Sequence, residues 1–462
     1  MTALLWLRRD LRRRDLPALG AAVRHGAEGG VVVAFVVDPR LWEGAGAARR
    51  AWLAATLTAL GEAYDGRLVL RHGDPQEVVP RLAVEVGAGS VHVSRETTPG
   101  GRRRDEAVAT ALRGLGIDWV ETGTPYAVGP GLVRNGSGDP YKVFTPFAKA
   151  WRAHGWPAPA TSPRDLRLLD ADSDAVARRL LDAALSADDV PPLPPAGEDA
   201  ALRRWRRFVE ERVAAYADDR DRPDRAGTSQ LSPYLKLGVV HPRTLLADLA
   251  PLGGTGAHTV ETELAWREFY ADVLWHNPRS AWADLQPGLS ELRYDEPDDA
   301  IRAWKDGRTG FPIVDAGMRQ LRATGWMHNR VRMITASFLT KDLHVWWPVG
   351  ARHFLDHLLD GDLASNNHGW QWVAGTGTDA APYVRVFNPV TQGLRFDPEG
   401  DYVRQWVPEL AHLRGRAAHE PWEHPDGYAH GYPVRIVDHA AERDEALARY
   451  EAARGRGAGG RR

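Results

Sequence analysis

The first 121 residues alternate short apolar runs with helical patterns, and no other feature of the sequence constrains the fold as much. Each run is rich in valine or leucine and short enough to be a buried strand. Because helical patterns separate the runs, we expect an α/β domain built on a doubly wound parallel sheet. The predicted strands are Leu4–Leu7, Val31–Asp38, Leu68–Arg71, Val91–Ser94 and Ile117–Glu121. The predicted helices between them are Pro17–Arg24, Ala47–Tyr64, Pro75–Val86 and Arg104–Leu112.

The rest of the chain has almost no strand signals. The proline-rich run Pro191–Pro195 closes a connector, and apolar residues then recur at helical spacing. We therefore expect residues 1–125 to form the α/β domain and residues 126–195 the connector. An all-helical domain should span residues 196–452, and the Gly/Arg-rich residues 453–462 should form a disordered tail.

Composition excludes several classes of site. The chain has no cysteine, so it holds no disulfide, thiolate metal site or cysteine nucleophile. It shows neither a secretory signal nor an apolar run of membrane-spanning length, and we expect a cytoplasmic monomer. With a net charge of −2, nucleic-acid binding would need a local basic patch. The 18 tryptophans outnumber the 12 tyrosines and 10 phenylalanines, which suggests that some indole rings stack or carry charge.

Four polar motifs stand in the predicted helical domain. In Gly227–Leu235, Ser232 would cap a helix that Pro233 begins. The start of this helix is either a binding site for a pyrophosphate or an ordinary capped helix end. Glu263 and Trp266 share one helix face, as do Asn329 and Met333. Asp360–Trp372 lacks the spacing of a metal loop, so we expect no metal and interpret it as the wall of an aromatic cofactor pocket.

Long stretches of the chain resemble the DNA photolyase/cryptochrome family, and within it the class I cyclobutane pyrimidine dimer (CPD) photolyases. They occur in family order and span nearly the whole chain. The matching stretches are Leu5–Arg12, Gly227–Leu235, Trp266–Tyr270, Thr309–Arg319, Gly325–Met333 and Asp360–Pro389. The resemblance implies an α/β antenna domain followed by a helical FAD-binding domain.

The resemblance implies that the protein is a lyase that repairs CPDs by electron transfer from excited, reduced FAD to a flipped-out lesion. Asn366 would face flavin N5, and Arg332 would pair with Asp360. The implied FAD contacts are Tyr216, Thr228, Ser229, Leu231, Ser232, Trp266, Arg267, Asn329, Arg332, Asp360, Asp362 and Asn366. The implied lesion pocket is Glu263, Trp266, Asn329, Met333 and Trp372, with Arg220, Arg330 and Arg385 on DNA phosphates.

Relatives reduce their flavin through a relay of three tryptophans. Trp370 and Trp347 match the inner two, whereas Tyr294 stands at the outer place and leaves Trp346 or Trp304 as possible substitutes. A second, antenna chromophore is also implied. Gly100 and Gly101 stand where folate-binding relatives have Asn and Glu, which favours an 8-hydroxydeazaflavin over folate. Its expected contacts are Arg9, Phe35, Asp38, Arg50, Glu96 and Lys236.

Two other members of the family remain alternatives. A cryptochrome would be a light sensor that does not repair DNA. At the position that faces flavin N5, however, this chain has Asn366, as photolyases do, whereas plant cryptochromes have Asp and animal cryptochromes have Cys. A (6-4) photolyase would use two histidines where this chain has Asn329 and Met333. Val260 departs from the family, because many relatives place a lesion-flanking Trp there. A single-strand-binding protein with tryptophan platforms would explain the tryptophans but not Asn366.

Overall fold

The computed structural model of the chain describes all residues except 287–288, 290–291, 379–384 and 460–462. Contacts divide the chain into two compact units. The first unit comprises Met1–Ala214, Ser229–Pro278 and Leu359–Gly361, and the second comprises Ala215–Thr228, Arg279–Leu358 and Asp362–Arg462. The predicted domain boundaries at residues 125 and 195 stay a prediction.

A five-stranded parallel sheet forms the N-terminal part of the first unit, as the valine-rich runs predicted. Its strand order is β3-β2-β1-β4-β5, and Leu5 of the central strand lies opposite Val33 and His92. The two halves of the sheet therefore extend in opposite directions from β1, which is the doubly wound arrangement. The strands are β1 (Thr2–Leu7), β2 (Val31–Val37), β3 (Leu68–His72), β4 (Ala88–Val93) and β5 (Asp118–Glu121).

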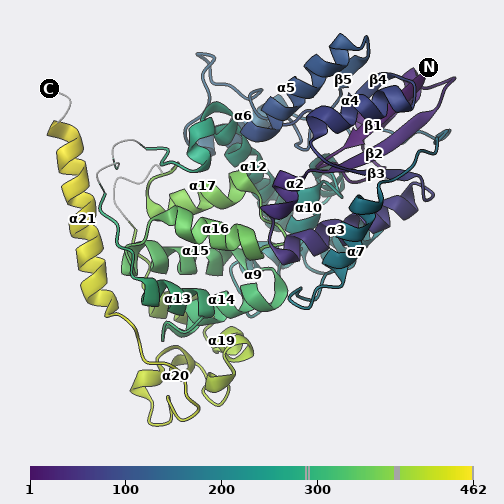
Figure 1. Cartoon of the computed structure of the whole chain (residues 1–462). Coiled ribbons are helices and arrows are strands. Elements are labelled where there is room, and N and C mark those ends of the chain that lie inside the picture. The colour runs from purple at the N-terminus through teal and green to yellow at the C-terminus, as the bar shows by residue number, and fades with distance from the viewer. Residues whose placement is uncertain (287–288, 290–291, 379–384, 460–462) are drawn as a thin grey trace. The chain divides into compact units, whose positions relative to one another are not determined.

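Helices cover both faces of this sheet, with α4 and α5 on one side and α3 and α7 on the other (Figure 1). Alternate strand residues such as Leu4 and Trp6 share a buried cluster with Val79 of α4 and Val108 of α5. Strands β1 and β2 are buried along nearly their whole length, which is why they read as nearly continuous apolar runs, whereas the edge strand β5 is partly exposed. The helices of this part are α1 (Pro17–His25), α2 (Pro39–Glu43), α3 (Ala47–Ala63), α4 (Pro75–Glu85), α5 (Pro99–Gly114), α6 (Phe144–His154) and α7 (Ala175–Leu185).

The remaining helices of the first unit come from the later, helical part of the chain. The longest of them carries Glu263 and Trp266. They are α8 (Glu198–Glu211), α10 (Ser232–Leu237), α11 (Pro242–Leu249) and α12 (Gly254–His276).

Helices alone build the described part of the second unit. Helix α17 packs against α15 and α16 around a large buried cluster that contains Trp304, Trp347 and Trp370 (Figure 1). After α15 the chain makes one π-helical segment, η4 (Phe338–Asp342). The other helices are α9 (Tyr216–Asp219), α13 (Asp298–Asp306), α14 (Pro312–Thr324), α15 (Asn329–Ser337), α16 (Trp347–His357), α17 (Leu363–Ala374), α18 (Pro389–Phe396), α19 (Asp401–Trp406), α20 (Arg416–His419) and α21 (His439–Gly459).

The structure corrects two local predictions. Helix α10 begins at Ser232 itself, and its cap residue Leu231 makes no side-chain capping bond, so Ser232 is not the cap. Helix α21 continues to Gly459, where the sequence predicted a disordered tail from residue 453. Ala453 is buried in one cluster with Leu289 and Leu292, which anchors this end of the helix. In the described residues no helix is long and apolar enough to cross a membrane.

Candidate functional site

Four of the six predicted antenna residues lie at or near the ends of strands, whereas Arg50 lies in α3 and Lys236 in α10. Arg9 follows β1, Phe35 and Asp38 lie at the end of β2, and Glu96 follows β4. Since β1 and β4 flank the point where the strand order reverses, these residues gather at the edge where open α/β sheets bind ligands.

A buried ion pair joins two of these residues. An Arg9 Nη2 atom lies 3.1 Å from Glu96 Oε1 and also donates to Thr97 Oγ1 at 2.9 Å. Burial would raise the pKa of Glu96, but the cations of Arg9, Arg104 and Arg8 outweigh it and lower the pKa to about 2. Glu96 also accepts from the backbone N–H groups of Thr97 and Thr98. It is therefore an ionised carboxylate that the protein already satisfies.

Gly101 is a glycine because Glu96 occupies the adjacent space. A Cβ atom at position 101 would come within 2.4 Å of Glu96 Cγ. A longer side chain at position 101 does not fit without moving Glu96. Asp38 has a local partner instead, because it accepts from Arg40 N at 3.0 Å and caps α2.

Helix α12 presents the indole of Trp266 against an aromatic neighbour that the sequence did not indicate. The ring of Phe144 stacks on Trp266 with centroids 3.6 Å apart and planes 8° from parallel. Phe144 begins α6, inside the predicted connector, where no periodic signal marked it. One face of Trp266 is thus covered, and the ring orientation is fixed. Glu263 lies three residues earlier on the same face of α12.

Arg267 holds the first unit together through backbone oxygens. Its guanidinium donates to the carbonyl oxygens of Pro125 and Leu235 and lies 4.4 Å from the ring centre of Tyr126. This side chain links α12 to α10 and to the segment after β5. Its predicted contact with FAD stays a prediction, as do those of Ser229, Leu231 and Ser232 in the same unit.

In the second unit, the first turn of α17 carries two of the predicted flavin residues. Asp362 caps the helix by accepting from Ala364 N and Ser365 N. The Asn366 amide nitrogen donates to Ala351 O at 3.1 Å and to Asn367 Oδ1 at 2.9 Å. Within the described residues the Asn366 Oδ1 atom accepts no hydrogen bond, so a half-buried amide oxygen is left available for a ligand donor.

Helix α15 carries Asn329, Arg330 and Met333 on its first turns. Arg330 makes a two-point ion pair with Asp221, at 2.8 and 3.3 Å, and its guanidinium lies 4.5 Å from the ring centre of Phe396. The Arg220 Nε atom lies 4.0 Å from the same carboxylate. Two predicted DNA-binding arginines thus meet at one acidic residue that the sequence analysis did not single out.

The neighbouring residues of the second unit include a further arginine–aromatic pair. The Arg385 guanidinium carbon lies 5.6 Å from the ring centre of Trp372 on α17. Both are predicted to face the substrate, and the structure brings them together. Residues 379–384 of the same matching stretch lie outside the described residues.

The predicted relay residues lie in or beside the core of the second unit. Trp370 packs edge-on against Phe354 at 4.9 Å and Trp304 at 6.1 Å between ring centres. Trp347 is fully buried, and its Nε1 atom donates to Asp284 Oδ1 at 2.7 Å. Asp284 is a second acidic residue that no sequence motif marked.

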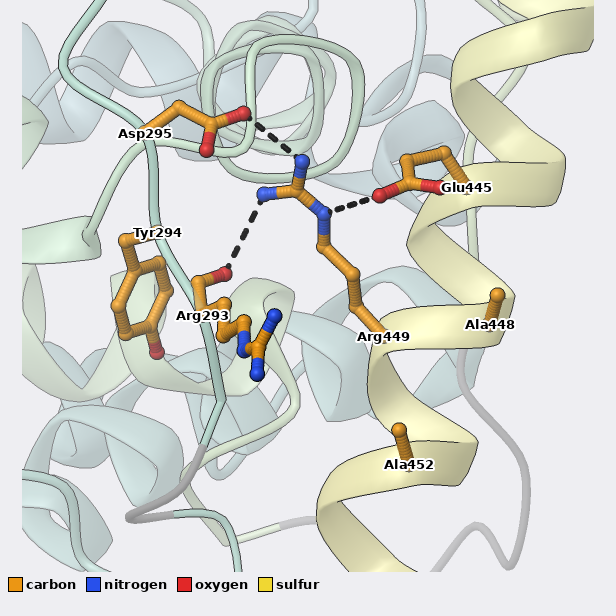
Figure 2. Close-up of a pocket in the computed structure, with 7 residues that line it drawn as sticks. All are labelled: Arg293, Tyr294, Asp295, Glu445, Ala448, Arg449 and Ala452. Carbon is orange, nitrogen blue, oxygen red and sulfur yellow. Dashed lines mark hydrogen bonds and ion pairs between the residues drawn. The ribbon is translucent and has the colours of Figure 1, made fainter.

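A cavity of about 590 Å³ lies next to Tyr294, between residues 293–295 and helix α21 (Figure 2). Arg449 of α21 reaches across it to Asp295 and pairs with Glu445 on its own helix. Among the residues that line this cavity, Tyr294 is the one that the sequence analysis assigned to the electron relay. The residues predicted to contact FAD do not line this cavity.

The predicted residues are shared between the two units. Glu263, Trp266 and Asp360 belong to the first unit, whereas Asn329 and Arg332 belong to the second. The predicted pair of Arg332 and Asp360 therefore stays a prediction. Within its own unit, Arg332 Nε donates to Met327 O at 2.8 Å. The roles predicted for Tyr216, Thr228, Arg50 and Lys236 also stay predictions.

Comparisons with known proteins match both the N-terminal and the C-terminal part of the chain. One family profile, DNA photolyase, matches residues 3–168, and another, the FAD-binding domain of DNA photolyase, matches residues 260–452. A deoxyribodipyrimidine photo-lyase of Streptomyces griseus is 43% identical over 96% of this chain and 97% of its own length. A crystal structure of a class III photolyase from Agrobacterium tumefaciens is 35% identical, with a TM-score of 0.89 over 98% of both chains. A cryptochrome structure from Synechocystis is 27% identical, with a TM-score of 0.87 over 97% of this chain and 98% of its own.

Proposed function

This chain belongs to the DNA photolyase family, and from that premise we propose that it repairs cyclobutane pyrimidine dimers in DNA under blue or near-ultraviolet light. The observation that carries the proposal is the fixed amide of Asn366. Its nitrogen is engaged with Ala351 O and Asn367, so its oxygen is presented as an acceptor.

FAD fits this set of side chains. A reduced flavin carries an N–H at N5, and an amide oxygen is a neutral acceptor for it. Asn366 would hold N5, while Asp360, Asp362 and Arg332 would contact the ring and the folded adenine. The bound, reduced flavin supplies the light-excited electron that splits the dimer. The protein supplies the position of the lesion and the charges around it.

The lesion pocket would be formed by Glu263, Trp266, Asn329, Met333 and Trp372. Trp266, whose orientation Phe144 fixes, offers a flat apolar wall against the flipped pyrimidines. The protonated Glu263 carboxyl would donate to pyrimidine carbonyl oxygens and stabilise the negative charge that develops there. Met333 adds an apolar contact where a (6-4) photolyase would place a histidine.

DNA would bind through phosphate contacts from Arg220, Arg330 and Arg385. Arg385 also lies over Trp372, so one side chain would link the phosphate backbone to the lesion pocket. Because a dimer stacks poorly, flipping it out costs less than flipping an intact pair.

We also propose a second chromophore at the carboxyl edge of the sheet. The Glu96 side chain against Gly101 disfavours a folate there, so 8-hydroxydeazaflavin is the ligand proposed, with Arg50 and Lys236 as further contacts. Mass spectrometry of chromophores released from the purified protein tests this assignment, and a methenyl-folate would contradict it.

A cryptochrome-type light sensor is the second candidate, since the fold is also that of the Synechocystis cryptochrome. An assay of dimer repair distinguishes a photolyase from a light sensor. Chemically reduced protein, illuminated with near-ultraviolet light, should restore thymine absorbance in dimer-containing DNA. Dark samples should show no change. A fully reduced, illuminated protein that leaves every dimer intact would favour the sensor.

Glu263→Gln tests the pocket within the same assay. We expect repair to slow by about tenfold, equivalent to about 1.4 kcal/mol, with a much smaller loss of lesion binding. Glu261→Gln is the matched control, because Glu261 lies on the same helix but pairs with Arg152. Equal effects of the two changes would remove Glu263 from the pocket.

A further inference from the structure

Two tryptophans adjacent in sequence connect the core of the second unit to solvent. Trp347 begins α16 and is fully buried, whereas Trp346 immediately before it is 38% exposed. Their ring centres are 6.5 Å apart. A charge that reaches Trp347 therefore has an indole neighbour with direct access to water.

Asp284 lies beside both indoles. Its carboxylate accepts from Trp347 Nε1 at 2.7 Å. Burial raises the pKa of Asp284, while the side chains of Trp347, Thr376 and Trp346 lower it again. A carboxylate at this place stabilises positive charge on either ring and so favours passage of a hole from one to the other.

Tyr294 is badly placed to end such a relay. Its ring centre is 6.4 Å from that of Trp346, but its phenol oxygen is buried and makes no hydrogen bond within the described residues. A phenol gives up an electron readily only when its proton leaves as well. Because the described residues offer the phenol oxygen no hydrogen-bond partner and burial raises the pKa of Tyr294, its oxidation is disfavoured.

Trp304 is no better as an endpoint. Its ring lies 6.1 Å from Trp370, but the side chain is fully buried and its Nε1 atom donates to the carbonyl oxygen of Thr335. A carbonyl oxygen is a poor proton acceptor, and water does not reach this ring. Of the three candidate endpoints, Trp346 alone is exposed.

We propose that Trp346, and not Tyr294, is the outermost member of the electron relay that reduces the bound flavin. In the last step the oxidised Trp347 takes one electron from Trp346, and the Trp346 indole then releases its N–H proton to water. An external thiol then gives one electron and one proton to the Trp346 radical and becomes a thiyl radical, and two such thiyl radicals combine to a disulfide. The proposal rests on FAD binding, and not on dimer repair.

The test compares Trp346→Phe with Tyr294→Phe as its matched control, in flavin-loaded full-length protein without DNA. After a blue flash, the parent and Tyr294→Phe should show a long-lived neutral tryptophan radical by transient absorption. In Trp346→Phe the long-lived radical should be lost, and photoreduction with thiol should fall about tenfold, equivalent to about 1.4 kcal/mol. Flavin content and melting temperature confirm that both variants are folded.

A spin trap gives a readout on the unmutated protein. Illumination without thiol should leave the trap covalently on Trp346, as fragmentation of the peptide by mass spectrometry shows. An adduct on Tyr294, a tyrosyl spectrum, or parental behaviour of Trp346→Phe would overturn the proposal. Repair by chemically reduced protein needs no relay, so that assay reports on the proposed function separately.

Discussion

At the scale of single residues, Asp221 governs how the predicted DNA-binding arginines are presented. Its carboxylate holds Arg330 in a two-point pair, the geometry in which arginine also binds a phosphate. Asp221 would thus compete with a DNA phosphate for Arg330. We predict that Asp221→Asn tightens DNA binding several-fold and steepens its salt dependence by about one unit, because one more phosphate contact becomes available. Fluorescence anisotropy across a salt series measures both quantities.

Two variants control this prediction. Asp224 lies in the same segment, but its carboxylate pairs with Arg222. Asp224→Asn should therefore change the affinity for DNA less than Asp221→Asn does. Arg330→Gln should remove the added unit of salt slope and abolish the effect of Asp221→Asn in the double variant. Additive effects of the two changes would show that Asp221 acts through another residue.

At the scale of secondary structure, Asp397 joins α18 to α19. It ends α18, and its carboxylate accepts from Tyr402 N and Val403 N at 3.0 Å each. Burial raises its pKa to about 6, and Asp224 and Asp401 act in the same direction. Between about pH 4 and 6 the folded protein keeps a proton that the unfolded chain has lost. Raising the pH through this window therefore lowers the free energy of unfolding, by on the order of 3 kcal/mol from this group.

Asp397→Asn removes this titration. Melting temperatures between pH 4 and 7 should show a smaller decline with rising pH in the variant than in the parent. Glu399→Gln is the control, since Glu399 is exposed and lies in the same segment between α18 and α19. Parallel curves for parent and Asp397→Asn would contradict the assignment of the pH dependence to this carboxyl.

Local sequence patterns predicted the strands well and the helix ends less well. All five strands form where short apolar runs indicated them, and the signal is clearest for β1 and β2, because a strand buried on both faces must be apolar along its length. The predicted start of α10 was wrong by one residue, because helix boundaries depend on backbone geometry that a Ser-Pro pair alone does not determine. The order in α21 beyond residue 453 was missed because Ala453 is buried against residues far away in sequence.

At the scale of the whole molecule, the fold class and the family were predictable, and the partners of the site residues were not. Phe144 stacks on Trp266 from more than a hundred residues away, and Asp221 pairs with Arg330 across a similar separation. Asp284 meets Trp347 in the same way. None of the three belongs to a periodic pattern or a motif. Long-range pairs of this kind decide the orientation and charge of a site, and only the folded chain shows them.

The central claim is that this photolyase acts on cyclobutane dimers, and the most direct test offers the protein two lesions. One duplex carries a single cyclobutane thymine dimer, and a second of the same sequence carries a (6-4) photoproduct. Chemically reduced protein is added to each, and chromatography of the digested strands follows both lesions in the light and in the dark. Light should remove the cyclobutane dimer and leave the (6-4) photoproduct intact. Repair of the (6-4) photoproduct, or of neither lesion, would contradict it.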